Sequence, residues 1–377
     1  MSDNSQDTQS GNDQPGNDNS AELQQQIEQA VVDKTKFNIV GNNTKSFLGV
    51  INDAPALDVS AHSGIVSYEP TELVITARAG TTLREINTRL SEYDQTLAFE
   101  PPAFGSDATL GGTVACALAG PAKPYLGGTR DYILGCKILN GKGQILQFGG
   151  EVMKNVAGYD VSRLMTGAMG TLGLLLDISV KVLPKAKSEL TLSATMESDK
   201  AIEDMQALAA LGLPITASAY IEGTLYIRLS GTETAINAAA NKLESSDSTH
   251  STVYASDDTE LWTQLKEHTH PFFQNQSSLW RISVPALTKP LDLDGTWLYD
   301  WAGTQRWLFT DVAANAIRSQ CESAGGHATL YRGSDELKRS VGVFHPLPKA
   351  LLTLQQRLKH EFDPQCVFNH QRLFPDF

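Results

Sequence analysis

The sequence is poor in cysteine, with four in 377 residues, and no two of them are close enough to form a C-x-x-C pair. This absence excludes zinc and iron–sulfur sites of the kind that a local cysteine motif marks. Cys116 and Cys136 stand in apolar surroundings, as inert core thiols do; the other two are Cys321 and Cys366. If the chain takes part in redox chemistry, onward transfer of single electrons must therefore take place elsewhere.

Positive charge and long apolar runs are also scarce. The chain has 30 Lys and Arg against 43 Asp and Glu, a formal net charge of −13 that argues against a nucleic-acid-binding surface. The longest uncharged run of small and apolar residues, 108–122, is too short and too rich in glycine to span a bilayer. Residues 1–20 are mostly Ser, Asp, Asn, Gln and Gly, without the basic and apolar regions of an export signal. We therefore expect a disordered tail and a cytoplasmic protein.

The chain is long enough for two domains, and its glycines are concentrated in one region. Of 30 glycines, 15 fall in the 69 residues from 105 to 173, where apolar runs separate them. Glycine within ordered structure indicates positive φ or a close approach of the backbone to another group. A series of tight turns in a β-rich domain would explain any one of these glycines. For the whole set we favour a bound cofactor.

Two loops could bind an anion through main-chain N–H groups. Residues 41–46, Gly-Asn-Asn-Thr-Lys-Ser, follow an expected strand at 36–40, and Gly and Asn tolerate the left-handed backbone that forms a concave nest of amides. A plain Asn-rich turn would look similar. Residues 105–113 follow Pro101-Pro102 and predict a turn with bare N–H groups. Neither loop is a Walker A or G-x-G-x-x-G motif.

Glycines at 167, 170 and 173 precede a strand, whereas a Rossmann fingerprint follows one, which disfavours a nicotinamide dehydrogenase of that type. Composition changes after residue 187. From there the patterns spell β-α-β-β-α, and a strand at 279–284 would complete a ferredoxin-like unit. We expect a fold of the α+β class. Its predicted divisions are a tail at 1–20, a cofactor-binding domain at 21–187, a cap at 188–345, and a C-terminal helix and tail at 346–377 that pack back on the first domain.

Several blocks together resemble flavoproteins of the vanillyl-alcohol-oxidase type, which have the PCMH-type FAD-binding fold. These blocks are residues 40–49, 100–120 with Thr-Leu-Gly-Gly at 109–112, 127–131 and 167–174. Within that family, the FAD-binding (GlcE-type) subunits of bacterial glycolate oxidase are also similar at residues 148–160, 278–285, 300–307 and 325–330. The resemblance implies a PCMH-type FAD-binding domain of two α+β subdomains plus a ferredoxin-like C-terminal cap domain.

The resemblance also implies FAD that lies extended between the two subdomains, with its diphosphate on the first loop. Relatives that bind flavin covalently use a His or Cys near the phosphate loop or in the cap. Because the phosphate loop here has neither, we expect non-covalent FAD. The expected FAD-binding residues are Gly41, Asn42, Asn43, Thr44, Lys45, Ser46, Pro102, Gly105, Thr109, Leu110, Gly111, Gly112, Thr113, Gly120, Gly170, Thr171, Gly173 and Leu174.

The family reaction is hydride transfer from C2–H of a 2-hydroxy acid to flavin N5, with a base that takes the hydroxyl proton. A substrate carboxylate is suited to an arginine fork, for which Arg281 and Arg306 are candidates. Stacking on the adjacent tryptophans or pairing with Asp300 is the alternative, structural interpretation of both arginines.

His327 is the only histidine in a family-like block and is the candidate base, with a core or surface position as the alternative. Related enzymes have a cluster of histidines and acids that binds a metal at the substrate. No such cluster is evident here, so we expect no metal. His268 and His270 precede a proline and are expected in a solvated loop.

The resulting hypothesis is the FAD-binding subunit of a complex that oxidises glycolate, or a related D-2-hydroxy acid, to the 2-oxo acid. The resemblance implies two partners, a sister flavin subunit and an iron–sulfur subunit, with membrane association only through partners. One alternative is a self-sufficient FAD-dependent 2-hydroxy-acid oxidase or dehydrogenase. Another is a structural subunit that keeps the fold and has lost the cofactor.

Overall fold

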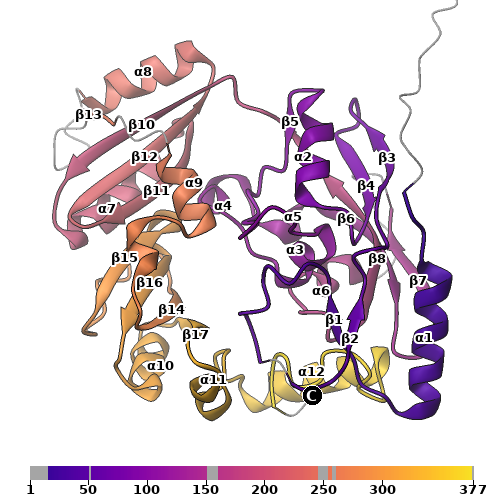
Figure 1. Cartoon of the computed structure of the whole chain (residues 1–377). Coiled ribbons are helices and arrows are strands. Elements are labelled where there is room, and N and C mark those ends of the chain that lie inside the picture. The colour runs from indigo at the N-terminus through magenta and orange to yellow at the C-terminus, as the bar shows by residue number, and fades with distance from the viewer. Residues whose placement is uncertain (1–15, 51, 151–159, 245–253, 257–259, 376–377) are drawn as a thin grey trace, which may run out of the picture.

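The computed structural model describes residues 16–50, 52–150, 160–244, 254–256 and 260–375. The chain forms two parts, each organised around one antiparallel sheet, which lie beside each other in Figure 1. Helices and strands are mixed in both parts, so the expected α+β class is confirmed. Of the tail predicted at 1–20, residues 1–15 lie outside the described residues. In the described part of the chain, no helix combines the length and apolar character needed to cross a membrane.

The first part contains a five-stranded sheet. In order across the sheet, its strands are β3 (Ile65–Glu69), β4 (Val74–Arg78), β8 (Leu174–Lys181), β6 (Ile133–Leu139) and β7 (Ile145–Gly149). Three helices pack on it through one apolar cluster: α2 (Leu83–Ser91), α3 (Leu110–Cys116) and α6 (Val161–Met165). The central strand β8 is buried almost throughout, because its side chains pack into two apolar clusters, one with α2, α3 and α6 and the other with Leu23 and Ile27.

Smaller elements complete the first part. Strand β1 (Asn38–Val40) pairs in parallel with β2 (Ala56–Asp58) and leads into the 41–46 loop. Strand β5 (Gln95–Thr96) pairs with β9 (Leu183–Pro184). Three further helices are α1 (Ser20–Asp33), α4 (Lys123–Leu126) and α5 (Thr129–Tyr132).

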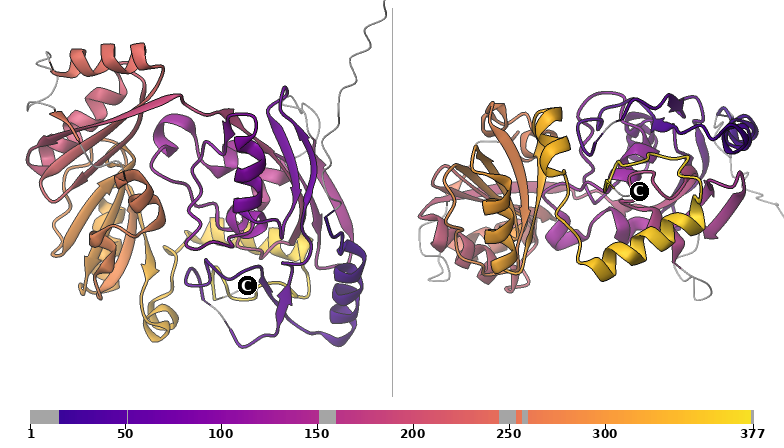
Figure 2. Two further views of the ribbon diagram at one scale, coloured as in Figure 1. Left: turned by 45° about the horizontal axis from the view of Figure 1, so that its top comes forward. Right: turned by 90° about the horizontal axis from the view of Figure 1, so that it is seen from below.

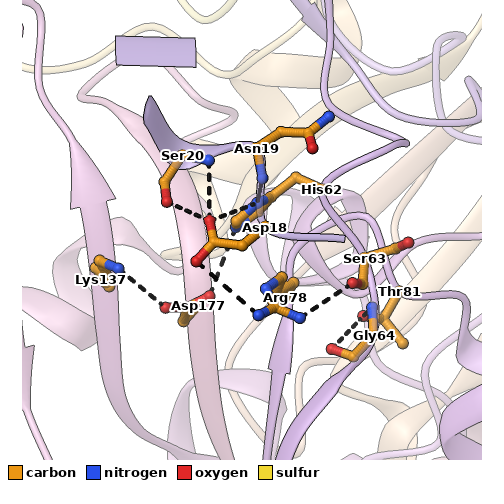
Figure 3. A network of polar contacts seen from close by, with 10 residues as sticks. All are labelled: Asp18, Asn19, Ser20, His62, Ser63, Gly64, Arg78, Thr81, Lys137 and Asp177. Carbon is orange, nitrogen blue, oxygen red and sulfur yellow. Dashed lines mark hydrogen bonds and ion pairs between the residues drawn. The ribbon is translucent and has the colours of Figure 1, made fainter. Parts of the chain in front are cut away.

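The segment before α1 is held by a polar network that joins it to the five-stranded sheet (Figure 3). The backbone N–H of Asn19 donates to Nδ1 of His62 at 3.1 Å, and Asp18 lies 3.9 Å from Arg78. On its other side, Nε2 of His62 lies 3.5 Å from Asp177 of β8. The start of α1 is therefore fixed against the sheet by residues far away in sequence.

The second part contains an eight-stranded antiparallel sheet. In order across the sheet, its strands are β13 (Tyr254–Ala255), β10 (Ser188–Thr195), β12 (Thr224–Gly231), β11 (Ile215–Ile221), β15 (Thr296–Asp300), β16 (Gln305–Thr310), β14 (Ser278–Ser283) and β17 (His327–Arg332).

The strand predicted at 279–284 exists as β14, but its predicted place is wrong. In a ferredoxin-like unit the fourth strand pairs with the first, and here the two-residue β13 pairs with β10. Strand β14 instead lies between β16 and β17. The sequence on either side of β13 is charged and rich in Ser, which is typical of a surface loop and does not indicate a strand.

The two faces of the eight-stranded sheet have different neighbours. One face packs against α7 (Ser198–Ala209), α8 (Glu233–Glu244) and α10 (Ala314–Ser323). The other face contacts the first part together with α9 (Leu261–Glu267) and the short helix η1 (Pro271–Gln274). We call this second contact region the seam. Between β15 and β16 the chain makes a second short helix, η2 (Trp301–Gly303).

The C-terminal segment returns to the first part. After β17 come α11 (Asp335–Val341) and α12 (Lys349–Phe362), and α12 runs along the first part when the molecule is seen from below (Figure 2). Val367 and Phe368 then pack in one apolar cluster with Leu23 and Ile27 of α1. The two ends of the described chain therefore share one core.

Candidate cofactor and substrate site

A cleft in the first part encloses about 880 Å³ of empty space, part of it open to solvent. Its walls come from four stretches that are distant in sequence: residues 38–46, 109–116, 169–175 and 369–372. We call it the loop cleft. Because strand β1 ends at residue 40 and α3 begins at residue 110, the two predicted anion-binding loops meet across this space.

The first loop has the predicted properties. The backbone N–H groups of residues 41–45 donate to no acceptor among the described residues. Asn43 has a φ of 56°, the left-handed conformation that Asn tolerates. Unpaired main-chain amides in this arrangement form a nest that suits an anion.

The second loop presents bare amides only in part: the N–H groups of residues 105–109 donate to no acceptor among the described residues, but for residues 110–113 the expectation is wrong. Leu110 N–H donates to Thr81 O at 2.8 Å and Gly111 N–H to Ala79 O at 2.7 Å. The side chain of Thr109 caps α3 by accepting from Gly112 N–H at 3.3 Å. Gly111 and Gly112 therefore allow close packing and leave space, while their own N–H groups are already bonded within the protein.

Two cations in the cleft wall have no carboxylate partner among the described residues. Lys45 is 6% exposed, and its Nζ lies 3.4 Å from Thr44 Oγ1 and 3.5 Å from Ala103 O. Burial lowers the pKa of Lys45 and of Arg372, and the buried Nε of Arg372 has no hydrogen-bond partner in the described part of the chain. An unpaired buried cation is costly, so the cleft fits a group that brings negative charge, as a diphosphate does.

A second, smaller cavity lies at the seam, with about 320 Å³ of empty space in all, part of it open to solvent. We call it the seam cavity. The first part lines it with residues 118–121 and Pro102. The second part contributes Leu265, Lys266, His268, Arg281, Asp300, Gln305, Trp307 and Tyr331. Cys116 lines the loop cleft and Leu118 lines the seam cavity, so the two spaces adjoin at the end of α3.

Comparison with known proteins agrees with this geometry. Residues 17–149 match a family model described as an FAD binding domain. Over 359 residues the chain is 43% identical to the glycolate oxidase subunit GlcE of Escherichia coli (strain K12), an alignment that covers 95% of this chain and 98% of that protein. The chain belongs to the GlcE family. This confirms the predicted resemblance and FAD as the expected cofactor.

More distant relatives match shorter stretches of this GlcE-family chain. It is 35% identical over 133 residues to the glycolate oxidase subunit GlcD of Bacillus subtilis (strain 168), which covers 34% of this chain and 28% of that protein. It is 31% identical over 134 residues to a D-lactate dehydrogenase of Anaerostipes hadrus, covering 36% and 28%. A solved structure of p-cresol methylhydroxylase with substrate bound superposes with a TM-score of 0.70 at 14% identity, over 95% of this chain and 88% of that one, which shows the same fold.

The predicted FAD-binding residues divide between the two spaces. The loop cleft is lined by Gly41, Asn42, Asn43, Thr44, Lys45, Ser46, Thr109, Gly111, Gly112, Gly170, Gly173 and Leu174. Pro102 and Gly120 line the seam cavity. Gly105 lies beside Thr44, and Leu110, Thr113 and Thr171 are buried next to the cleft without lining it. The side-chain oxygen of Thr113 has no partner among the described residues.

Sequence reasoning missed the C-terminal contribution to the cleft. Asn369 accepts from Ile39 N–H at 2.7 Å and donates to Met169 O at 2.6 Å, and it lines the cleft with Arg372. No local motif marks either residue, because both belong to the irregular tail after α12.

The structure separates the two candidate arginines. Arg281 of β14 pairs with Trp307 of β16, so both lie on the face at the seam. Arg306 precedes Trp307 in the same strand and points to the opposite face. It is fully buried, and its three nitrogens donate to the carbonyls of Gly303, Lys289 and Thr288. Arg306 therefore has a structural position away from both spaces.

The histidines are also arranged differently from the sequence expectation. His327 starts β17, is exposed, and lines neither space. His268, expected in a solvated loop, is 7% exposed and lines the seam cavity. Its ring stacks on Phe273 with centroids 3.9 Å apart. Within the described residues, no three His, Cys, Asp or Glu side chains are grouped so as to hold a metal ion.

Proposed function

We propose that this chain is the FAD-binding subunit of a glycolate oxidase complex and oxidises glycolate, or a related D-2-hydroxy acid, to the 2-oxo acid. The observation that supports this best is the loop cleft, where the amides of residues 41–45 share one space with Lys45 and Arg372. Among the described residues, these amides donate to no acceptor and the two cations have no carboxylate counter-ion. The names of the relatives, glycolate oxidase subunit and D-lactate dehydrogenase, support the substrate class.

In this proposal the chain's own residues hold the cofactor by charge and shape. The amides of the first loop and Lys45 would receive the diphosphate. Gly112 would leave space beside α3, while Asn369 and Arg372 would form the far wall. When bound, FAD supplies the two-electron acceptor for the hydride that leaves C2 of the substrate. Of the two candidate arginines, Arg281 is the one that lines a cavity and would receive the substrate carboxylate.

We expect the flavin to be held without a covalent bond. The first loop has no His or Cys. Cys116 lines the cleft, but burial raises the pKa of its thiol and so keeps it protonated, which makes it a poor nucleophile. Acid precipitation should release all flavin into the supernatant, and flavin that stays on the polypeptide would contradict this part of the proposal.

In this proposal the two parts of the chain, each built on one sheet, have different roles. Residues 21–187 would form the FAD-binding domain, 188–345 the cap that meets substrate and partners, and 346–377 the segment that closes the cleft from the far side. Because the sequence has no iron–sulfur motif, electrons would leave through a sister flavin subunit and an iron–sulfur subunit. The complex would lie in the cytoplasm, with any membrane contact made by partners.

The test is to purify the full chain and to measure its flavin absorbance and the ratio of FAD to protein. We expect a yellow chain with equimolar FAD. A colourless chain that takes up no added FAD would contradict the proposal and favour a structural subunit. If glycolate or D-lactate fully bleaches the flavin of the isolated chain and turnover continues without partners, the self-sufficient oxidase is the better description.

A further inference from the structure

We propose that the outward side of α12 is the docking surface for a partner subunit that offers an apolar contact flanked by acidic residues. This inference deepens the proposed function and rests on it for the class of partner, a subunit that accepts electrons.

Exposed leucines form a stripe along α12. Leu351, Leu354 and Leu358 are three, four and seven residues apart, so their side chains lie on one side of the helix. Leu351 is 50% and Leu354 52% exposed, and Leu358 packs against the apolar cluster of the first part. We call these three residues the leucine stripe. Within the described chain, Leu351 and Leu354 are the one pair of exposed large apolar side chains on a single helix, and grouped apolar side chains mark contact surfaces more often than isolated ones do.

The exposed leucines are not needed to attach α12 to the protein. A different row, Leu352, Gln355, Lys359 and Phe362, is the more buried side of the helix. Nζ of Lys359 donates to Thr171 O at 2.7 Å, and Phe362 packs against the apolar cluster of the first part. The helix runs along the outside of that part (Figure 2). Its outward side is therefore available to another protein.

The charge around the stripe is of one sign. Residues 337–360 contain five Lys and Arg and no Asp or Glu, in a chain of net charge −13. Two of these cations, Lys338 and Lys359, are bonded within the protein. The exposed side chains of Lys349 and Arg357, on α12 itself, have no ion pair in the part of the chain that the structure describes. An acidic contact would therefore complement this surface.

A second copy of this chain and a membrane are poorer occupants. Two α12 helices packed through their stripes would bring Lys349 and Arg357 of both copies into one small contact, where like charges repel. An anionic membrane would attract the same cations, but it is a plane that also faces the acidic remainder of the chain, and two half-exposed leucines offer it little apolar area. A protein partner can place its acidic residues opposite α12 alone.

The position of the stripe suits a partner that takes up electrons. From Leu354 to Lys359 the helix rises by about 7.5 Å, at 1.5 Å per residue. Lys359 contacts Thr171, and the preceding residue, Gly170, lines the loop cleft. The tail after α12 supplies two more residues to the same cleft. A partner on the stripe would therefore stand close to the wall of the cofactor space.

The test measures binding of the FAD-loaded full chain to the sister flavin subunit and the iron–sulfur subunit of the same organism, purified together. Biolayer interferometry is carried out at low and at high salt, about 50 and 300 mM NaCl. Leu351→Gln combined with Leu354→Gln removes the exposed part of the stripe and keeps a good helix former at both positions. It should weaken binding about 10- to 100-fold, as loss of buried anchor residues does, and leave FAD content and melting temperature at wild-type values. Val32→Gln, at an exposed position of α1, is the matched control and should change none of these.

Charge reversal tests the electrostatic part. Arg357→Glu should slow association about 3- to 10-fold at the lower salt concentration and reduce the difference between the two salt concentrations, because a charge at the rim of an interface acts mainly on the association rate. Arg84→Glu, at an exposed position of α2, should do neither.

The other outcomes act on the inference and on the proposed function separately. No complex with the wild type, or unchanged affinity in the double glutamine variant, overturns this inference. A wild-type dimer in light scattering that this variant abolishes assigns the stripe to a second copy, and binding to phosphatidylserine vesicles that it abolishes assigns the stripe to a membrane. Either result overturns the inference too. A wild type that binds the partners through α12 but holds no FAD overturns the proposed function and leaves the docking surface in place.

Discussion

At the scale of single residues, the ionisation of Asp300 makes the stability of the folded protein depend on pH. Burial raises its pKa to about 7 from an ordinary 3.8, with smaller opposing effects from its hydrogen bonds to Trp301 and Gln305. The folded state therefore holds this proton more tightly than the unfolded state does. Ionisation of Asp300 therefore lowers the free energy of unfolding. This loss grows as the pH rises from about 4 to about 7 and is complete above pH 7.

Asp300→Asn should remove this cost. The free energy of unfolding of the variant, relative to wild type, should increase as the pH rises from 5 to 8, by about 2–4 kcal/mol at pH 8. Urea unfolding at several pH values measures this difference. The exposed Asp311→Asn is the control and should show no such trend. A difference between Asp300→Asn and wild type that does not change with pH would contradict the prediction.

Gly112 and Gly111 are adjacent in sequence but should respond differently to a bulky side chain. A Cβ on Gly112 would lie 3.2 Å from Thr109 Oγ1, at the edge of the loop cleft. A Cβ on Gly111 would lie 2.7 Å from Ala79 Cβ, inside the core. Gly112→Leu should therefore weaken FAD binding at least about tenfold, the equivalent of 1.4 kcal/mol, and leave the melting temperature of the FAD-free chain close to wild type. Gly111→Leu should weaken FAD binding and also lower the melting temperature of the FAD-free chain.

Flavin content and thermal melts of the two variants test this, with Gly231→Leu as a control outside both spaces. Normal FAD content in Gly112→Leu would count against the placement of the cofactor in the loop cleft.

At the scale of elements, the end of α12 fixes the wall of the loop cleft. Nζ of Lys359 donates to Asp363 and to Thr171 O, both at 2.7 Å, and to Phe368 O at 2.9 Å. Asp363 is fully buried and also accepts from the N–H groups of Val367 and Phe368. This network connects α12, the turn at Thr171 before β8 and the tail that contains Asn369 and Arg372.

Lys359→Met should leave the carboxylate of Asp363 buried without its cation. The expected loss is about 3–5 kcal/mol of unfolding free energy, together with weaker FAD binding because the tail that forms the cleft wall is released. Urea unfolding and FAD titration measure the two effects. Lys349→Met, at the exposed start of the same helix, should change neither. Full stability in Lys359→Met would show that the tail is held by other contacts.

At the scale of the whole molecule, the two parts are joined by a few polar contacts across the seam. The side chain of Arg228 of β12 is 6% exposed and lies 2.7 Å from Glu100 of the first part. Glu267 of α9 accepts from Ala103 and Phe104 N–H at 3.0 and 2.8 Å. Trp301 donates to Gly120 O at 3.0 Å. These contacts surround the seam cavity, so its shape depends on how the two parts are held.

A double-mutant cycle on Glu100→Gln and Arg228→Met should give a coupling energy of about 1–3 kcal/mol, because the pair is largely excluded from solvent. The exposed pair Arg84 and Asp107, 3.1 Å apart within the first part, is the matched control and should give about 0–1 kcal/mol. Urea unfolding measures both cycles, and limited proteolysis shows whether the parts loosen. Equal coupling in the two pairs would mean that the seam does not depend on this contact.

Several features of the structure could be predicted from interactions between residues that are close in sequence. The glycine and asparagine content of residues 41–46 predicted a loop with free amides, and the structure has it. The hairpin from 138 to 146 and the Thr82 cap of α2 follow from turn and capping chemistry, which act over a few residues. Even the separation of Arg281 from Arg306 is readable in part, because neighbours in a strand point to opposite faces and Arg306 directly precedes Trp307.

The sequence by itself therefore determined the α+β class, the amide-rich loop and the family, since these depend on short-range backbone preferences and ordered motifs. Only the tertiary structure decided which partners the polar groups find. It occupied the amides of Leu110 and Gly111 with the carbonyls of Thr81 and Ala79, buried His268 beside Tyr331, and brought Asn369 and Arg372 to the loop cleft. Each of these contacts joins residues far apart in the chain, so no local pattern encodes it.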